Sequence, residues 1–599
     1  MKSVRVTVSA ICVILAVAFF SSSRHLFAQS EQQTQPEQAV TPPPYNPYPP
    51  GILPSNLNSE LARVEREIQG IFNNYLAQSK ALPPLTYVGN PPILQGDGYN
   101  AMRILGGLLN YDLNMSPFKN TACSSCHMPY AAFSGPIPSV NLTMIAYPGS
   151  YRYRAGKRTA QRYTYSHSFP VLNYNTTQGA FFGGNFWDSR ATGYQLQAPD
   201  AEQAQWPPLD PAEMQFPDLA CIAYRISKSS YLTLFEEIWG PFSINWPSDT
   251  ETICDTPAGA TTFGGSTTPI ALSPTDRTTA KNVYDHWGQT LGFLEASNEI
   301  SPFTSKFDAF LAGKYTLTPP EMAGYNLFRG KANCNSCHLD GRSTAPTPPP
   351  PEGTLPNSMD TGAAADTTPV FTCWGSSNLG LPKNPRDSFY YETTPDSFGF
   401  TLNPAGFTYA DYGLGTFLRS GFATGPSPNS NWTQYAATSD GQMQTMTARD
   451  VAMTPPQCPT TEAPGPYFQK EFFHNGYIKS LKQLVHFYNT RDVYRYQVES
   501  GECPAGTVEK VTCWPAAEVP QNQDMTVGSL GLTDEEENQL VAFMQTLTDG
   551  YTKPYPFINT YTGACMTGGN AATQGNSTII PASVLRRMAV EAAGASGQK

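Results

Sequence analysis

Apolar residues recur at helical spacing in several separate stretches of the chain. Between residues 56 and 80, steps of three and four positions join Leu61, Val64, Ile68, Ile71, Phe72 and Leu76. This period predicts an amphipathic helix. Similar patterns predict helices at 98–109, 219–240, 279–294, 318–330, 479–488 and 533–547, with a short terminal helix near 584–593. Thr533 and Glu536 have the spacing of a capping box. We therefore expect a mainly α fold with little β structure.

The segments between these helices are long and rich in turn-forming residues. The 599 residues include 55 Pro and 48 Gly, and 14% are charged, which predicts a loop-rich globular protein of two or three domains. Residues 29–55 and the proline run at 345–351 should not form packed elements. The net charge of −11 argues against nucleic-acid binding. It would suit a basic redox partner, although acidity is also an ordinary way to stay soluble.

Two copies of Cys-x-x-Cys-His are the strongest chemical signal. They are Cys123-Ser-Ser-Cys126-His127 and Cys334-Asn-Ser-Cys337-His338. Two thiols at this spacing can bond to the vinyl groups of one porphyrin, and the adjacent imidazole can then ligate the iron. With 12 Cys and 7 His in the chain, chance would give about a few thousandths of one such motif. We therefore expect two covalently bound haem c groups.

Two other interpretations of these motifs are a thioredoxin-like redox pair and half of a zinc site. A redox pair does not need the His, and a zinc site would need a second pair of ligands close by, which neither motif has. Because the motifs lie in two successive helical stretches, we expect two cytochrome c-like haem domains with long loop insertions. The expected boundaries are a signal peptide at 1–28, an N-terminal extension with a helix at 29–95, a first haem domain at 96–312, a second at 313–551 and a tail at 552–599.

The N-terminus has the pattern of a secretory signal. Lys2 and Arg5 precede an apolar run from Val6 to Phe20, and Ala28 ends a tolerable cleavage site. The run is short for a bilayer span, although an uncleaved anchor is the competing interpretation. We expect a periplasmic or exported protein without a membrane span after cleavage.

Cysteine usage fits such a compartment, where most thiols should pair. Of the 12 cysteines, Cys12 lies in the signal and four belong to the haem motifs, which leaves seven. Cys221 with Cys254, or Cys503 with Cys513, would close short local loops. Because seven is odd, at least one free thiol or an intermolecular bond is expected.

Five ordered segments carry a resemblance to one known family. They are Phe186-Trp187-Asp188-Ser189-Arg190 with Gln197 after it, Glu213-Met214, 307–313 continuing through 324–328, 473–476, and 541–547. Over roughly residues 98–550 the chain resembles the bacterial di-haem cytochrome c peroxidases and the MauG-type enzymes. The resemblance implies that peroxide reacts at the haem of His127, and that the haem of His338 stores and relays electrons.

The resemblance also assigns roles to three residues outside the haem motifs. Glu213 matches the acid–base group beside the bound peroxide, Gln197 matches a hydrogen-bond donor, and Trp187 matches the indole between the two haems. Without the resemblance, Glu213 and Gln197 would be ordinary surface residues and Trp187 a core residue. The implied partners are hydrogen peroxide and a small cytochrome c or cupredoxin donor, and relatives of this kind are often homodimers.

Two positions depart from the classical peroxidases of that family. The family places Met or Tyr fourteen residues after the His matched by His474, and here that residue is Tyr488. Tyr488 therefore resembles the sixth ligand of the MauG-like branch, and a phenolate would favour ferric iron more than a thioether does. His486 is the alternative ligand, although two positions away on a helix it points elsewhere.

The second departure concerns the first haem and the calcium between the haem domains. Residues 155–162 contain no His where classical peroxidases have one that blocks the resting iron, so we expect an open iron site. His167 occupies the position that matches the family's calcium-binding Asn. Calcium is therefore implied by the resemblance and weakened by this substitution.

These observations favour a periplasmic di-haem peroxidase that reduces hydrogen peroxide to water, by way of a ferryl first haem and a relay second haem. One alternative is a MauG-like or rubber-oxygenase-like enzyme that oxidises a protein or an organic substrate. Tyr488 and the missing His favour this alternative. A non-enzymatic electron carrier is a third hypothesis, but it would need strong ligands on both sides of each iron.

Overall fold

The computed structural model describes residues 57–83, 85, 97–137, 140, 145–259, 262–341, 369–420, 430–453, 471–479, 481–494 and 503–549. The predicted signal peptide, the proline run at 345–351, the terminal helix at 584–593, Cys458 and Cys565 lie outside these ranges. Within them, no helix has the length and apolar character needed to span a membrane.

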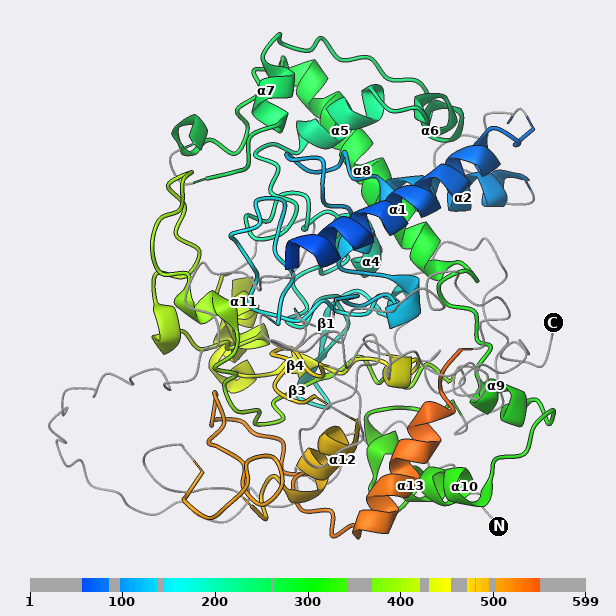
Figure 1. Cartoon of the computed structure of the whole chain (residues 1–599), viewed down its shortest axis with the longest axis vertical. Coiled ribbons are helices and arrows are strands. Elements are labelled where there is room, and N and C mark those ends of the chain that lie inside the picture. Colours follow the sequence, from blue (N-terminus) through cyan, green and yellow to red (C-terminus); the bar gives the residue numbers. More distant parts are fainter. Residues whose placement is uncertain are drawn as a thin grey trace, which may run out of the picture.

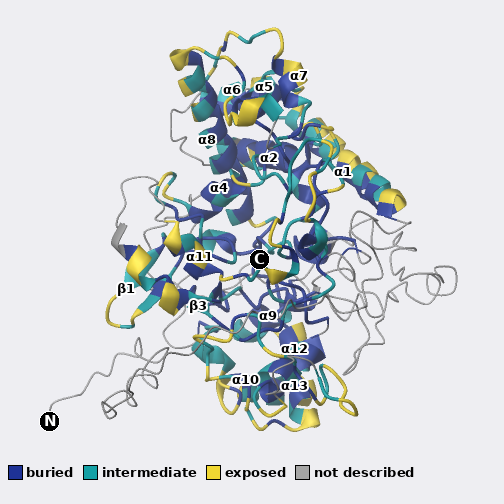
Figure 2. Ribbon diagram, turned by 90° about the vertical axis from the view of Figure 1, so that its left-hand side faces the viewer, coloured by how far each residue is buried: buried dark blue, intermediate teal, exposed yellow. Residues whose placement is uncertain are grey.

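The first group of helices surrounds one long central helix, α8 (Pro274–Ala296) (Figure 1). The others are α1 (Leu57–Ser79), α2 (Asp97–Tyr111), α4 (Pro199–Ala204), α5 (Ala220–Ser227), α6 (Leu232–Trp239) and α7 (Thr250–Cys254). α2, α4 and α5 pack on α8, and α1 packs on α2. Leu61, Val64 and Ile68 of α1 are buried, as their spacing predicts. Figure 2 shows the buried residues gathered where α2, α4 and α8 meet.

The second group of helices lies at the other end of the molecule (Figure 1). It contains α9 (Lys306–Leu311), α10 (Pro319–Arg329), α12 (Leu481–Thr490) and α13 (Asp534–Gln545), while α11 (Leu414–Arg419) lies between the two groups. α10 and α13 pack closely because Gly324 has no side chain: a Cβ there would lie 1.9 Å from the Gln539 carbonyl oxygen. The rings of Phe307, Phe328 and Phe543 form the centre of this second core.

Among the described residues, strand structure is limited to two small antiparallel sheets between these groups. β1 (Asn173–Asn175) pairs with β2 (Ala180–Phe182), and β3 (Ser376–Ser377) pairs with β4 (Met443–Gln444). The remaining short elements are 3-10 turns: η2 (Cys123–Ser125), η3 (Pro129–Ala131), η4 (Ser166–Ser168), η5 (Thr262–Gly265), η6 (Cys334–Ser336), η7 (Ser388–Tyr391), η8 (Gly406–Thr408), η9 (Ser430–Tyr435), η10 (Ala437–Ser439) and η11 (Val451–Met453). The expectation of a mainly α fold with little β structure is confirmed.

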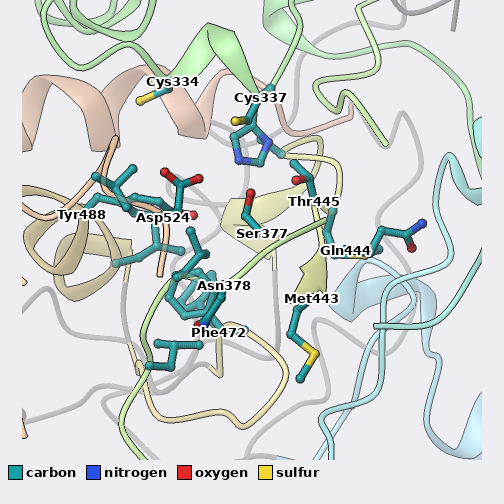
Figure 3. Close-up of a pocket in the computed structure, with 18 of the residues that line it drawn as sticks. Cys334, Cys337, Ser377, Asn378, Met443, Gln444, Thr445, Phe472, Tyr488 and Asp524 are labelled. Carbon is teal, nitrogen blue, oxygen red and sulfur yellow. The ribbon is translucent and has the colours of Figure 1, made fainter. Parts of the chain in front are cut away.

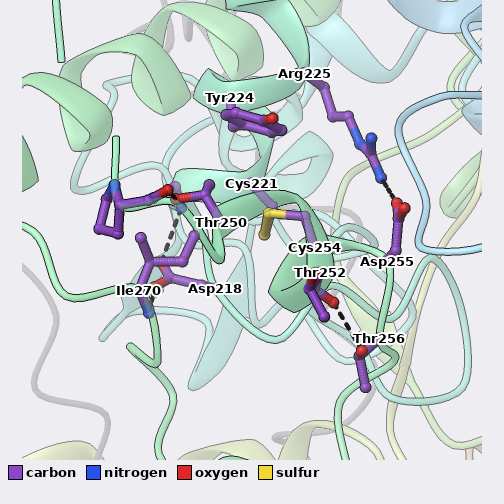
Figure 4. The surroundings of a disulfide bond; sticks show 12 residues. Asp218, Cys221, Tyr224, Arg225, Thr250, Thr252, Cys254, Asp255, Thr256 and Ile270 are labelled. Carbon is purple, nitrogen blue, oxygen red and sulfur yellow. Dashed lines mark hydrogen bonds and ion pairs between the residues drawn. A yellow bond between two sulfur atoms is a disulfide. The ribbon is translucent and has the colours of Figure 1, made fainter. Parts of the chain in front are cut away.

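Two disulfides brace the two groups of helices separately. Cys221–Cys254 joins α5 to α7 (Figure 4), and Cys503–Cys513 closes a loop beside α12. Both are the local pairs that the sequence suggested. Cys373 forms no disulfide, in agreement with the odd number of cysteines.

Candidate functional site

The two Cys-x-x-Cys-His motifs adopt the same local structure. Each begins with a 3-10 turn, η2 or η6, and each His donates its backbone N–H to the carbonyl oxygen of the first Cys, at 3.1 Å for His127 and 2.9 Å for His338. None of the four motif thiols is in a disulfide. All four are therefore free to form thioether bonds to a porphyrin.

Both histidine rings are held by a backbone carbonyl. His127 Nδ1 lies 2.8 Å from the Phe133 oxygen, and His338 Nδ1 lies 2.9 Å from the Phe371 oxygen. Phe133 and Phe371 have positive φ values of 56° and 53°, so both turns use the same uncommon backbone conformation. Burial lowers the pKa of His127 to about 4 and also lowers the pKa of His338. Each imidazole is therefore neutral, with Nε2 as the nitrogen available to a metal.

A cavity of about 500 Å³ lies beside the first motif and is lined by Cys123, Cys126 and His127. This volume is in the range of sites that enclose small molecules. The charged and polar residues on its walls include Lys157, Arg158, Arg190, Gln203, Asp210 and Glu213. Phe389, Leu402 and Tyr409 also line it, so the segment after the second motif completes the first cavity. The thiols, the neutral imidazole and the cavity together fit a covalently held haem.

Glu213 is the carboxyl of this cavity with the most distinctive electrostatics. Burial raises its pKa to about 8; the negative charge of Asp210 adds to this rise, and Arg190 opposes it. At neutral pH the side chain therefore exchanges a proton readily, which suits an acid–base group.

Gln197 does not line the cavity. Its side chain is exposed, and its Nε2 donates to the Tyr194 carbonyl oxygen at 3.3 Å. Gln203 lines the cavity instead, on α4. Pro199 at the start of α4 was an available sequence signal, because proline favours the first turn of a helix. A helix from Pro199 would have suggested Gln203 as an amide facing inward.

Trp187 lines both the first cavity and a second one beside the other motif. Its indole Nε1–H donates to the Thr159 carbonyl oxygen at 3.2 Å, and its ring lies edge-on to that of His474, 6.3 Å between centroids. Arg158, also buried, pairs with Asp188 at 2.7 Å and with Asp411 at 2.6 Å. Burial alone would raise the pKa of Asp188, but the cationic partners Arg158 and Arg190 lower it to about 2. The wall around Trp187 is therefore a fixed network of paired charges.

The second cavity, of about 210 Å³, is lined by Cys334, Cys337 and His338 (Figure 3). Tyr488 of α12 also lines it, near Asp524 in Figure 3. Burial raises the pKa of the Tyr488 phenol. Aliphatic side chains form much of the remaining wall: Leu379, Leu381, Val451, Leu484, Val485, Val527, Leu530 and Leu540. The two thiols and the neutral imidazole on its wall are the groups that would hold a haem covalently.

His486 is not among the residues that line the second cavity. Its Nδ1 lies 2.9 Å from Glu537 Oε1, and its Nε2 lies 2.8 Å from the Val511 carbonyl oxygen, so both ring nitrogens have protein partners. Sequence reasoning missed Met443, Met446 and Met544, which also line this cavity.

The position matched to the calcium-binding Asn lies away from both cavities. His167 is largely buried, its Nδ1 has no hydrogen-bond partner, and burial lowers its pKa to about 4. In the described ranges, no three side chains of His, Cys, Asp or Glu come together as a group that could hold a metal ion. Calcium therefore stays a prediction.

Known proteins match this chain in sequence and in fold. Residues 100–316 match the family model described as di-haem cytochrome c peroxidase. The methylamine utilization protein MauG of Paracoccus denitrificans is 26% identical over 458 residues, which cover 76% of this chain and 90% of MauG. The cytochrome-c peroxidase IdrP1 of Denitromonas iodatirespirans is 22% identical over 472 residues, which cover 78% of this chain and 86% of the relative.

Among solved structures, the diheme peroxidase BthA of Burkholderia thailandensis shares the fold. It superposes with a TM-score of 0.51 at 21% identity, covering 78% of this chain and 89% of BthA. Residues 100–316 therefore match the di-haem cytochrome c peroxidase family model, and the chain as a whole is similar in sequence to MauG and IdrP1 and shares its fold with BthA.

Proposed function

We propose that this protein is a di-haem c-type peroxidase, which reduces hydrogen peroxide to water at the first cavity with electrons from a small redox protein. The observation that carries the proposal is Glu213, a partly buried carboxyl with a pKa raised to about 8, which lines the same cavity as Cys123, Cys126 and His127. When bound there, the haem supplies an iron that binds peroxide and accepts electrons.

The protein's own side chains in the first cavity transfer the protons of the reaction. Reduction of one peroxide consumes two electrons and two protons and gives two waters. The Glu213 carboxylate takes the proton from one peroxide oxygen and returns it to the other oxygen as that oxygen leaves as water. Gln203 and Arg190 supply hydrogen-bond donors on the same walls.

The second cavity suits electron storage because many of its walls are aliphatic. Cys334 and Cys337 would hold the haem covalently, with His338 and Tyr488 as iron ligands. Leu381, Leu484 and other aliphatic side chains make part of this wall apolar, and Asp411, Glu518 and Asp524 line the rest of it with Arg162. Trp187, on the walls of both cavities, offers the electron a route between them.

A MauG-like oxidation of a protein or an organic substrate is the second candidate function. Tyr488 on the wall of the second cavity favours it, and so does the similarity to MauG. A phenolate ligand lowers the reduction potential of an iron relative to a thioether. The second site would then store oxidising equivalents for use on a substrate, instead of transferring electrons from a donor protein to the first site. The electron-carrier hypothesis would need a second strong iron ligand in the first cavity, where His127 is the only histidine and Met214 the only methionine among the described residues on the walls.

The cellular setting that we propose follows from the sequence. The signal-like N-terminus supports a periplasmic or exported protein, supplied by a small cytochrome c or cupredoxin. A homodimer and a bound calcium ion are further proposals that rest on the family resemblance.

The test is steady-state turnover of the haem-loaded protein with peroxide and a reduced small cytochrome c. The peroxidase proposal predicts oxidation of two cytochromes for each peroxide consumed. Rapid reaction with peroxide but no oxidation of any reduced cytochrome or cupredoxin would favour the MauG-like function. No reaction with peroxide would contradict both enzymatic proposals.

A further inference from the structure

Trp206 connects the first cavity with the molecular surface. The chain has eight tryptophans, all in described ranges, and Trp206 is the only exposed one, with 46% of its surface accessible. It also lines the first cavity, as does Trp187. Of these two indoles, Trp187 reaches the second cavity, whereas Trp206 reaches solvent.

The Trp206 ring is held in place by neighbours on the same wall. The Arg190 guanidinium lies 5.4 Å from the centroid of the Trp206 ring and 3.6 Å from that of Phe186. The rings of Phe186 and Trp206 are edge-to-face at 6.3 Å. Arg190 is itself fixed by an ion pair of 3.0 Å with Asp188, the residue after Trp187. The two indoles therefore flank one rigid aromatic and cationic cluster.

Packing alone does not require this arrangement. A stack of Arg on an exposed aromatic ring contributes about 0.5–1 kcal/mol, and a smaller ring or an aliphatic side chain would cover the same surface. Indole is, however, far more easily oxidised than a phenylalanine ring or an aliphatic side chain. An indole that lines the cavity where peroxide reacts and is also exposed to solvent can transfer an oxidising equivalent to the surface. It can then oxidise molecules that are too large to enter the cavity.

We propose that Trp206 is a surface oxidation site for phenolic groups on molecules too large to enter the first cavity. This inference rests on the proposed peroxide chemistry. Because the Arg190 guanidinium disfavours a second positive charge nearby, Trp206 gives up an electron to the oxidant that peroxide generates in the first cavity, and its indole N–H proton leaves to solvent in the same step. The resulting neutral indolyl radical takes a hydrogen atom from a phenol O–H, which restores Trp206.

The overall reaction balances with peroxide as the oxidant. One H₂O₂ and two phenols give two waters and two phenoxyl radicals. A phenol is the fitting substrate class because its O–H supplies both the electron and the proton that the indolyl radical lacks. The phenoxyl radicals then couple with one another away from the protein.

The test compares a small phenol, guaiacol, with tyramine coupled to a soluble dextran of high molecular mass. Wild-type holoprotein, Trp206→Phe and Trp246→Phe would be assayed with peroxide. Trp246 is a matched control because it is partly exposed in the same half of the molecule and lines neither cavity. We expect Trp206→Phe to lower the rate with tyramine-dextran at least tenfold more than the rate with guaiacol, and Trp246→Phe to change neither rate.

A second measurement does not depend on the variant. Wild-type holoprotein treated with peroxide and no donor should gain oxygen at Trp206, detected by peptide mass spectrometry, well before Trp246. An equal loss of both rates in Trp206→Phe, no oxidation of tyramine-dextran by the wild type, or oxidation of Trp246 ahead of Trp206 would overturn the inference. No absorbance change of the wild-type haems with peroxide would instead contradict the proposed function, and this inference with it.

Discussion

The two cavities share one attachment geometry and differ in their walls. In both, a 3-10 turn presents two thiols, and a backbone carbonyl of a phenylalanine with positive φ holds the His Nδ1. The first cavity then adds Glu213 and Asp210 beside Lys157 and Arg190, whereas the second adds Tyr488 and many aliphatic side chains beside four charged residues: Arg162, Asp411, Glu518 and Asp524. The Cys-x-x-Cys-His pentapeptide therefore determines where a haem would be held. Residues far away in sequence form the walls around it and determine which chemistry the haem would support.

The largest expected effect comes from removing the iron ligand of the second cavity while keeping its thiols. His338→Gly should abolish peroxide-dependent oxidation of a reduced cytochrome, because electrons would have no functional second site through which to enter. Steady-state turnover measures this effect. Haem content by mass spectrometry provides the control, since Cys334 and Cys337 can still attach the group. Wild-type turnover in this variant would reject a division of labour between the cavities.

Removing the acid–base group of the first cavity should have the next largest effect. Glu213→Gln should slow the absorbance change that follows peroxide addition by about 10²- to 10⁴-fold, the range for loss of general acid–base catalysis. Stopped-flow absorbance gives the rate. Glu251→Gln is the matched control, since Glu251 is an exposed residue of α7, and this variant should react like the wild type. A wild-type trace for Glu213→Gln would exclude this carboxyl as the proton-transfer group.

The pH dependence sharpens the same assignment. The pKa of Glu213 is raised to about 8, so the carboxylate that accepts the peroxide proton becomes more abundant as the pH rises. The rate should therefore increase with pH up to about 8 and then level off. Asp210→Asn removes a negative charge that raises this pKa, so the rise should move to lower pH. An unmoved profile would show that a different group titrates.

Tyr488→Phe should alter only the second site. Loss of the phenol ligand should change the low-spin ferric signal of one haem and raise its reduction potential, because a phenolate stabilises ferric iron. Electron paramagnetic resonance and a redox titration measure the two effects. Unchanged spectra would turn attention to Met443, Met446 or Met544, which line the same cavity.

The smallest expected effect is on stability and should be confined to the surroundings of α12. The loop closed by Cys503–Cys513 lies against this helix, where Trp514 Nε1 donates to Thr490 Oγ1 at 3.0 Å. Replacing both cysteines by serine should lower the free energy of unfolding by about 2–3 kcal/mol, as expected for a loop of this length. Chemical denaturation measures the change. The absorbance change of the first haem with peroxide should stay as in the wild type, and a loss there would contradict separate bracing of the two halves.

Much of the fold could be predicted because local patterns determine it. The predicted helix at 56–80 is α1, and the Thr533–Glu536 capping box begins α13. The predicted helix at 219–240 was wrong in one respect: it is two helices, α5 and α6, separated by the turn at Ser229. The apolar period continues through this turn, so periodicity alone could not reveal the break.

The site was less predictable because its walls come from distant segments. The haem motifs are contiguous, so sequence found them directly. Gln197 was assigned from the family resemblance, but its backbone has a positive φ of 59° and its side chain is exposed. Tyr409 reaches the first cavity from an insertion after the second motif, a long-range contact that no local pattern encodes.

The central claim is that one of the two haems has an open iron and the other a closed one. The most direct measurement is the electron paramagnetic resonance spectrum of the untreated, fully oxidised holoprotein. We predict one high-spin ferric signal, from the site of His127, and one low-spin signal, from the site of His338 and Tyr488. Two low-spin signals that both persist after peroxide is added would contradict the account.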